Sequence, residues 1–356
     1  MKIQTTRLSQ NRRGFTLVEL LVAAALSILI MAVISTAFQT GLATLSTLKS
    51  LGDMAERLKT ADTLLRSDLE AEHFATVDGA VGTVGDGSPG ALHVSDLRYN
   101  LVPPSANPLG GYFQIFQGMG SNSGEGNDAD GLLSSSADGT RGHRISITVK
   151  RNGKTPDLLF TAQITNPADL GIVSAMNVSD VTTNASTANS RWAQVDWFLD
   201  QSRPAVVNGV TTWPLIRRVR PIIEDSSKIV TLTSNASAEL VSMTPTNQVN
   251  TLRTIAIPAN RAPATSIPIS DARHGDDIVI TNVTSFEVRP MYSGIAYTSP
   301  DGVFADLPGP FPAQFDTGLG STIVNNRIRV IAVQVKIRVY DTKNKLSRQT
   351  TLVVKL

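Results

Sequence analysis

The chain has 356 residues, of which 41% are hydrophobic and 17% are charged, so it can form one large domain or two smaller ones and is not a disordered tail. It contains 32 Lys and Arg residues and 30 Asp and Glu residues, and four of the basic residues lie in the first thirteen positions. The rest of the chain therefore has no basic excess that would indicate a nucleic-acid-binding protein. The absence of cysteine excludes disulfides, thiolate metal sites and cysteine nucleophiles, and four histidines leave little material for metal chemistry.

The N-terminal region combines a basic segment with a long apolar run. Residues 1–13 contain no acid, and the apolar run extends from Phe15 to Phe38. As an α-helix this run spans about 36 Å, enough to cross a hydrocarbon layer of roughly 30 Å, and it is too long for the core of a cleaved secretory signal. The positive-inside rule then predicts a single-pass protein with a cytoplasmic N-terminus and the remainder outside the cytoplasmic membrane.

Glu19 is unexpected within this apolar run. A carboxylate there costs roughly 2.5 to 3.5 kcal/mol on membrane-insertion scales. If the chain were cut after Gly14, the new α-amino group of Phe15 would lie at the same depth and could neutralise Glu19, within one subunit or between subunits. The alternative interpretation is that Glu19 only marks the interfacial start of a membrane anchor.

Residues 12–20 read Arg-Arg-Gly-Phe-Thr-Leu-Val-Glu-Leu. This segment closely resembles the cleavage and methylation segment of type IV prepilins and type II secretion pseudopilins. The resemblance implies that a prepilin peptidase cuts between Gly14 and Phe15, that the Phe15 amine is N-methylated, and that the apolar helix is retained. It also implies that Glu19 pairs with the terminal amine of a neighbouring subunit during assembly.

The predicted fold class is α+β, with a long N-terminal helix packed on an antiparallel β-rich head. We divide the chain into a leader peptide at 1–14 with the basic residues Arg12 and Arg13, a transmembrane and assembly half of the helix at 15–38, an amphipathic extramembrane half at 39–75, and a head at 76–356 whose stretch 103–142 is a Gly- and Ser-rich loop region. The helix should run from Phe15 to about Phe74, with any bend at Gly41 or Gly52. Its apolar stripe comprises Leu42, Leu45, Leu48, Leu51, Met54, Leu58, Ala61, Leu65 and Leu69.

Short apolar or alternating segments predict the strands of the head. They are Leu92–Val102, Ile145–Val149, Leu158–Ile164, Trp192–Leu199, Trp213–Ile223, Lys228–Leu232, Ile278–Val288, Arg329–Tyr340 and Thr350–Leu356. The last two should form a hairpin. A second hairpin should join Trp192–Leu199 to the segment after Pro214, with Asn208 and Gly209 in the connection.

Three motifs suggest chemistry, and each has a more ordinary interpretation. Residues 85–90 satisfy a dinucleotide-binding glycine pattern, but neither the preceding strand nor the following helix is predicted, so a loop is favoured. Asp128 and Asp130 are weak candidates for calcium, in a loop that lacks the full ligand register. Asp271, His274, Asp276 and Asp277 could form a metal or acid/base site, but a charged turn is favoured.

Arg217, Arg218 and Arg220, near Trp213, are the main basic and aromatic concentration. Arginines that alternate on a strand usually form its solvated face, so this interpretation is favoured over nucleic-acid binding. No constellation of residues supports an enzyme, and no cofactor is expected.

The resulting hypothesis is a minor pilin or pseudopilin that assembles through its N-terminal helix. The order of segments in the head is similar to the J-type minor pseudopilin and the PilW-like minor pilins, and also to protein C of the Verru_Chthon cassette of prepilin-like proteins. The resemblance implies other pilin subunits, prepilin peptidase, an inner-membrane assembly platform and membrane lipid as partners. The alternatives are a membrane-anchored protein whose head binds DNA, a surface or a secreted substrate, and a signal-anchored hydrolase.

Overall fold

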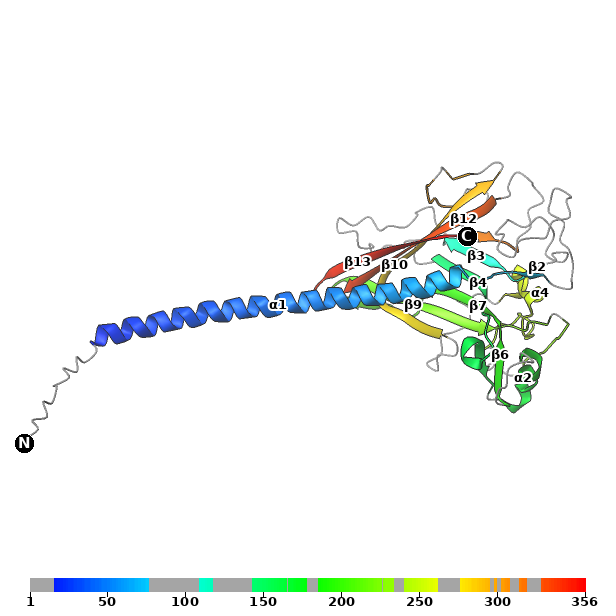
Figure 1. Cartoon of the computed structure of the whole chain (residues 1–356), viewed down its shortest axis with the longest axis horizontal. Coiled ribbons are helices and arrows are strands. Elements are labelled where there is room, and N and C mark those ends of the chain that lie inside the picture. The colour runs from blue at the N-terminus through cyan, green and yellow to red at the C-terminus, as the bar shows by residue number, and fades with distance from the viewer. Residues whose placement is uncertain are drawn as a thin grey trace, which may run out of the picture. The chain divides into compact units, whose positions relative to one another are not determined.

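The computed structural model describes residues 16–76, 109–117, 143–164, 166–177, 185–225, 227–233, 240–261, 276–294, 298–299, 302–307, 314–318 and 328–356 (Figure 1). The chain forms two units, residues 1–53 and residues 54–356. The four predicted divisions of the chain remain an interpretation of the sequence.

Helix α1 extends from Leu17 to Leu69 and passes Gly41 and Gly52 without a break in its helical structure. It ends before the predicted position near Phe74. The side chain of His73 explains this end, because its Nε2 lies 3.1 Å from the carbonyl oxygen of Leu69. That carbonyl would otherwise bond the backbone N–H of residue 73 in a further turn of helix.

The head is built from strands and short helical turns. The strands are β1 Ala75–Thr76, β2 Leu109–Gly110, β3 Phe113–Gln117, β4 His143–Lys150, β5 Phe160–Gln163, β6 Thr187–Ser190, β7 Trp192–Leu199, β8 Ala205–Val207, β9 Val210–Pro221, β10 Asp276–Gly294, β11 Gln314–Asp316, β12 Ile328–Asp341 and β13 Leu346–Lys355. The short helices are η3 Pro156–Leu158, η4 Pro167–Asp169, α2 Gly171–Met176, α4 Leu252–Ile255 and η5 Pro258–Asn260. The predicted α+β class is confirmed.

One antiparallel sheet dominates the described part of the head. Its nine strands follow the order β11-β3-β4-β7-β9-β10-β12-β13, with β8 paired to β9. Both predicted hairpin pairings are present, since β12 pairs with β13 and β7 pairs with β9. Asn208 and Gly209 close the tighter β8–β9 hairpin, where φ angles of 54° and 81° suit a two-residue turn of type I′.

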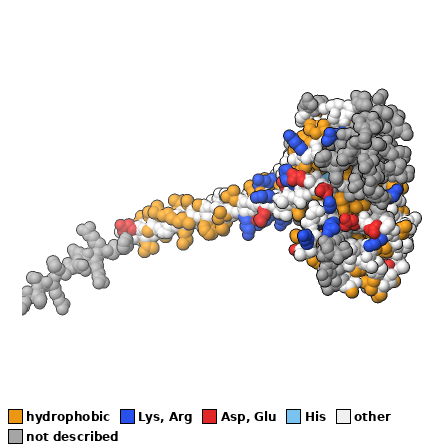
Figure 2. Space-filling model, turned by 45° about the vertical axis from the view of Figure 1, so that its right-hand side comes forward, with side chains coloured by type: hydrophobic (Ala, Val, Ile, Leu, Met, Phe, Trp, Pro, Cys, Tyr) orange, Lys and Arg blue, Asp and Glu red, His pale blue; other side chains and the backbone are white. Residues whose placement is uncertain are grey.

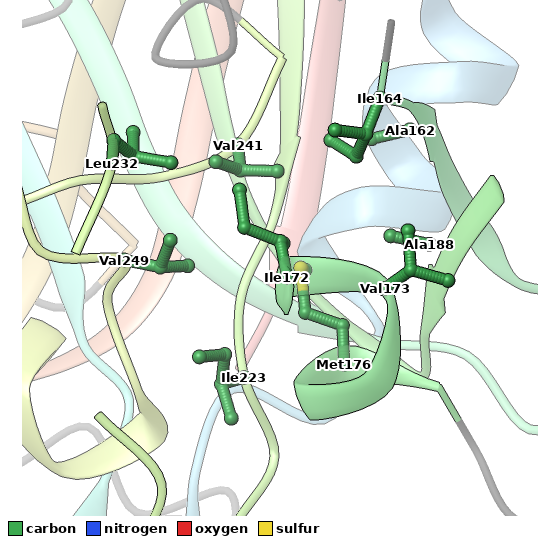
Figure 3. Close-up of a cluster of buried hydrophobic side chains, with 10 residues drawn as sticks. All are labelled: Ala162, Ile164, Ile172, Val173, Met176, Ala188, Ile223, Leu232, Val241 and Val249. Carbon is green, nitrogen blue, oxygen red and sulfur yellow. The ribbon is translucent and has the colours of Figure 1, made fainter. Parts of the chain in front are cut away.

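The C-terminal part of α1 contributes to the core of the head. Met54, Leu58, Ala61, Leu65 and Leu69 are all buried, which confirms the predicted apolar stripe from Met54 onward. A second hydrophobic cluster lies between α2, the β5–β6 pair and the segment 222–249 (Figure 3). Its buried members are Ala162, Ile164, Ile172, Val173, Met176, Ala188, Ile223, Leu232, Val241 and Val249.

Two sequence predictions for the head are wrong. The stretch 103–142 was expected to be loop, but β2 and β3 lie within it, and Phe113 and Ile115 of β3 are fully buried. Lys228–Leu232 was expected to be a strand, but it contributes only an isolated bridge between Thr231 and Gln248. The predicted strand Leu92–Val102 lies outside the described residues.

Candidate assembly site

The start of α1 is organised by Thr16 and Glu19. The backbone N–H of Glu19 donates to Oγ1 of Thr16 at 3.3 Å, and the backbone N–H of Thr16 donates to Oε2 of Glu19 at 3.1 Å. The Thr16 hydroxyl also donates to the same Oε2 at 3.1 Å. This reciprocal pattern is a capping box, which satisfies N–H groups that have no partner inside the helix.

The capping box gives Glu19 a role within its own chain. A carboxylate in the first helical turn also interacts favourably with the helix dipole. The spacing of Thr16 and Glu19 is the sequence signal for this motif, which the interpretation of the sequence missed. The Glu19 side chain is nevertheless exposed, and its Oε1 can accept from a further donor.

The first part of α1, from Leu17 to Leu48, is apolar on all sides and uncovered. Its large hydrophobic side chains are between 48% and 79% exposed, and they appear as an apolar surface along the helix (Figure 2). They are Leu17, Val18, Leu20, Leu21, Val22, Leu26, Ile28, Leu29, Ile30, Met31, Val33, Ile34, Phe38, Leu42, Leu45 and Leu48. Among the described residues, α1 is the helix whose length and composition would allow it to cross a membrane. A helix that is apolar all round needs an apolar environment, in lipid or in protein.

Five hydroxyl side chains within this segment donate to the backbone of their own helix. Hydroxyl groups of Ser27, Thr36 and Thr40 donate to the carbonyl oxygens four residues earlier, at 2.8 to 2.9 Å. Thr44 and Thr47 do the same at 2.9 and 3.0 Å. Because these hydroxyls need no water as a partner, they can be buried in lipid or in a helix bundle at little cost.

Comparison with protein families finds the prokaryotic N-terminal methylation motif at residues 9–35. The chain carries the type IV prepilin-like signature. No curated protein and no solved structure matches the chain. The signature supports a type IV pilin-like precursor and suggests a structural subunit rather than an enzyme. With the apolar helix, it is consistent with an anchor in the inner membrane.

The structure describes only part of the candidate processing site. Glu19 is at the beginning of α1, whereas Arg12, Arg13, Gly14 and Phe15 lie outside the described residues. The type IV prepilin-like signature covers all five positions. Their individual roles in cleavage, methylation and assembly remain predictions.

The arginines of β9 contradict the prediction of a solvated face. Arg217, Arg218 and Arg220 are 7%, 2% and 1% exposed, and each forms an ion pair with a buried aspartate. The partner aspartates are Asp68, Asp276 and Asp196, respectively. Their guanidinium groups are therefore buried in ion pairs inside the head. The three arginines that suggested a nucleic-acid site do not form a basic surface.

The Asp68–Arg217 pair joins α1 to the middle of the sheet. Nε and Nη2 of Arg217 each donate to a different oxygen of Asp68 at 2.7 Å. The indole N–H of Trp197 donates to the same carboxylate at 2.9 Å. Burial alone would lower the pKa of Arg217, but the hydrogen bonds and the charge of Asp68 outweigh it and raise that pKa.

Asp196 is the centre of a second buried polar network. It accepts from Nη2 of Arg220 at 3.2 Å and from the amide of Gln194 at 3.1 Å, and it also bonds the hydroxyl of Ser146. The Tyr112 hydroxyl contacts the Ser146 hydroxyl at 2.7 Å. Burial, followed by the charge of Asp196, raises the pKa of Tyr112 well above its usual range, so this hydroxyl stays protonated.

The other predicted candidates do not form a site in the described residues. Asp276 does not belong to a solvated turn, because it lies on β10 and is paired with Arg218; Asp271 and His274 lie outside the described residues. The weak calcium candidates Asp128 and Asp130 and the glycine pattern at 85–90 also lie outside them. Within the described residues, no group of three or more His, Asp or Glu side chains could hold a metal ion.

Proposed function

We propose that the chain is a minor structural subunit of a type IV pilus or a type II secretion pseudopilus, cut after Gly14 and inserted through α1 into the helical bundle of the filament. The observation that carries the proposal is the prepilin-like signature at residues 9–35, which extends into the exposed apolar part of α1. Transfer of this helix from lipid into a bundle gains little hydrophobic free energy. Specificity should therefore depend on packing and on Glu19.

In this proposal Glu19 acts twice. In the precursor it caps its own helix through Thr16. After cleavage, it pairs with the methylated α-amino group of Phe15 on a neighbouring subunit. The second role requires the negative charge, whereas the first requires only an acceptor oxygen.

Variants at two positions separate these roles. Glu19→Gln keeps an acceptor for the capping box and removes the charge, so we expect normal membrane insertion and normal leader cleavage but reduced incorporation into filaments. Thr16→Ala weakens the cap and keeps the charge, so incorporation should be close to normal. The measurement is the ratio of chain in sheared filaments to chain in membranes.

The matched control is Glu56→Gln, which removes an exposed carboxylate from the same helix. It should leave incorporation unchanged. Normal incorporation of Glu19→Gln would refute the assembly role of the charge. If the single variants Thr16→Ala and Glu19→Ala both failed to enter filaments while Glu19→Gln entered them normally, Glu19 would act only as a helix cap.

Processing has an independent test. Gly14→Leu should leave an uncut precursor, whereas the unaltered chain should begin at a Phe15 that carries one methyl group. Intact-protein mass spectrometry distinguishes the two. A mature chain that begins at any other residue would contradict the proposed cleavage.

The alternative of a membrane-anchored binding protein is separated by replacement of residues 15–38 with an unrelated apolar span. A tether should keep its function after this exchange, whereas a filament subunit should not assemble. The DNA-binding form of this alternative has lost its main support, because the arginines of β9 are paired inside the head.

A further inference from the structure

The two edges of the main sheet differ in length. The β11 edge has only three residues, Gln314–Asp316. The β13 edge has ten residues, Leu346–Lys355, and it pairs with β12 residue by residue from Asp341–Leu346 to Ala332–Lys355 without a register shift. Short strands, bulges, proline or a covering element usually protect an edge from further pairing. β13 is long and regular, and its sequence contains no proline.

The side chains of β13 are mostly uncovered. Eight of its ten residues are classed as exposed or half-buried, and the two buried ones, Leu352 and Val354, belong to the core face of the sheet. Val353 is 39% exposed on the opposite face. A strand that continues the sheet would therefore meet no obstacle from these side chains, and β13 could offer it backbone N–H and C=O groups.

The charge of this edge is one-sided. Residues 342–356 contain Lys343, Lys345, Arg348 and Lys355 and no Asp or Glu. All four of these side chains are exposed or lie in the exposed turn that leads into β13. The excess of basic residues in this segment is local, because the whole chain is nearly neutral, with 32 basic and 30 acidic residues. An added strand that carries carboxylates would be favoured there, and a basic strand would be disfavoured.

We propose that the outer edge of β13 binds an extended acidic segment of a partner protein as an additional strand of the sheet. Backbone hydrogen bonds supply the affinity, and pairing of carboxylates with the exposed Lys345 and Lys355 supplies the selectivity. A second copy of this chain is disfavoured as the occupant, because two β13 edges would bring together two basic strands and the β11 edge is too short to pair with ten residues. This proposal does not rest on the function proposed for α1.

The test uses the full chain in detergent micelles and a labelled peptide of about nine residues in which glutamate alternates with valine or threonine. Fluorescence anisotropy measures binding, and amide hydrogen exchange locates it. We expect saturable binding and slowed exchange of amides within residues 346–355. A peptide with lysine in place of glutamate should bind at least about tenfold more weakly, and a peptide with proline at alternate positions should not bind.

A double charge reversal tests the chain itself. Lys345→Glu with Lys355→Glu should weaken binding of the acidic peptide about tenfold, whereas the matched reversal of two exposed lysines elsewhere, Lys59→Glu with Lys154→Glu, should not. The proposal is overturned if the acidic peptide does not bind, if protection appears away from β13, or if the proline peptide binds equally well. Self-association of the chain with protection of residues 346–355 would also overturn it, because the occupant would then be a second copy.

Discussion

Loss of the Asp68 carboxylate should be among the most damaging single changes in the head. Asp68→Ala removes two hydrogen bonds of 2.7 Å to Arg217 and one of 2.9 Å to Trp197. The side chains of Arg217 and Asp68 are only 8% and 5% exposed, so water cannot replace the lost partner. Removal of one member of a buried pair costs about 3–5 kcal/mol, because the other charge remains buried and uncompensated. We therefore expect the free energy of unfolding to fall by about that amount.

Urea unfolding followed by tryptophan fluorescence measures this loss. The three tryptophans, Trp192, Trp197 and Trp213, all lie in the head and are buried, so the signal reports the head even when the full chain is held in detergent. The matched control is Glu72→Ala. Its 2.6 Å ion pair with Lys150 has side chains that are 49% and 27% exposed, respectively, and its loss should cost at most about 1 kcal/mol.

A double variant tests the physical reason for the effect. Asp68→Leu combined with Arg217→Met removes both charges and keeps apolar volume, so it should recover most of the stability lost by Asp68→Ala. The reasoning would be refuted if Asp68→Ala cost no more than the Glu72→Ala control. It would also be refuted if the double variant were as unstable as Asp68→Ala, because the damage could not then come from an unpaired arginine.

Two further predictions concern the junction after α1. Burial lowers the pKa of His73 below its ordinary value of 6.5, because it outweighs the opposite effect of the carbonyl oxygens of Thr148 and Leu69 beside the ring. The unfolded chain therefore binds the proton more readily, so the stability that neutral His73 contributes should be complete above about pH 6.5 and should decline as the pH falls below it. Urea unfolding at several pH values should show a smaller decline for His73→Gln. Gly111→Ala should destabilise the head by about 2–4 kcal/mol, because φ is 91° and the new Cβ would lie 2.3 Å from the His73 carbonyl oxygen. Gly209→Ala is the control, because its φ is 81° but the space around it is open, and it should cost only about 1 kcal/mol. Equal losses of stability for the two variants in urea unfolding would argue against the clash.

Local periodicity predicted the elements that depend on one segment alone. The strand Trp192–Leu199 has the predicted bounds, and the hairpin of β12 and β13 follows from alternation in β12 and a polar turn after Asp341. The apolar stripe of α1 from Met54 to Leu69 is also a local pattern. β3 was missed because it is a short strand between Gly-rich stretches, and its pairing with β4 depends on contacts that are distant in the sequence.

The candidate assembly site was visible in the sequence for the same reason. The chemistry proposed for it requires only a glycine, a phenylalanine and a glutamate at short spacing at the start of an apolar run, and the methylation motif at residues 9–35 covers all three positions. The capping box of Thr16 and Glu19 is equally local and could have been recognised from its spacing. The charges of the head were different, since no local pattern distinguishes a solvated arginine from one paired with an aspartate far along the chain.

The amino-acid sequence alone determined that this protein carries a prepilin-like signature and an apolar helix, because each of these features is encoded in one short continuous segment. Only the tertiary structure decided what the arginines of β9 do. Arg217 and Arg218 are adjacent and lie on opposite faces of the strand, yet both are buried, since Asp68 meets the first from α1 and Asp276 meets the second from β10. Strand alternation specifies which side chains share a face, whereas the elements that cover each face are set by packing between residues distant in the sequence.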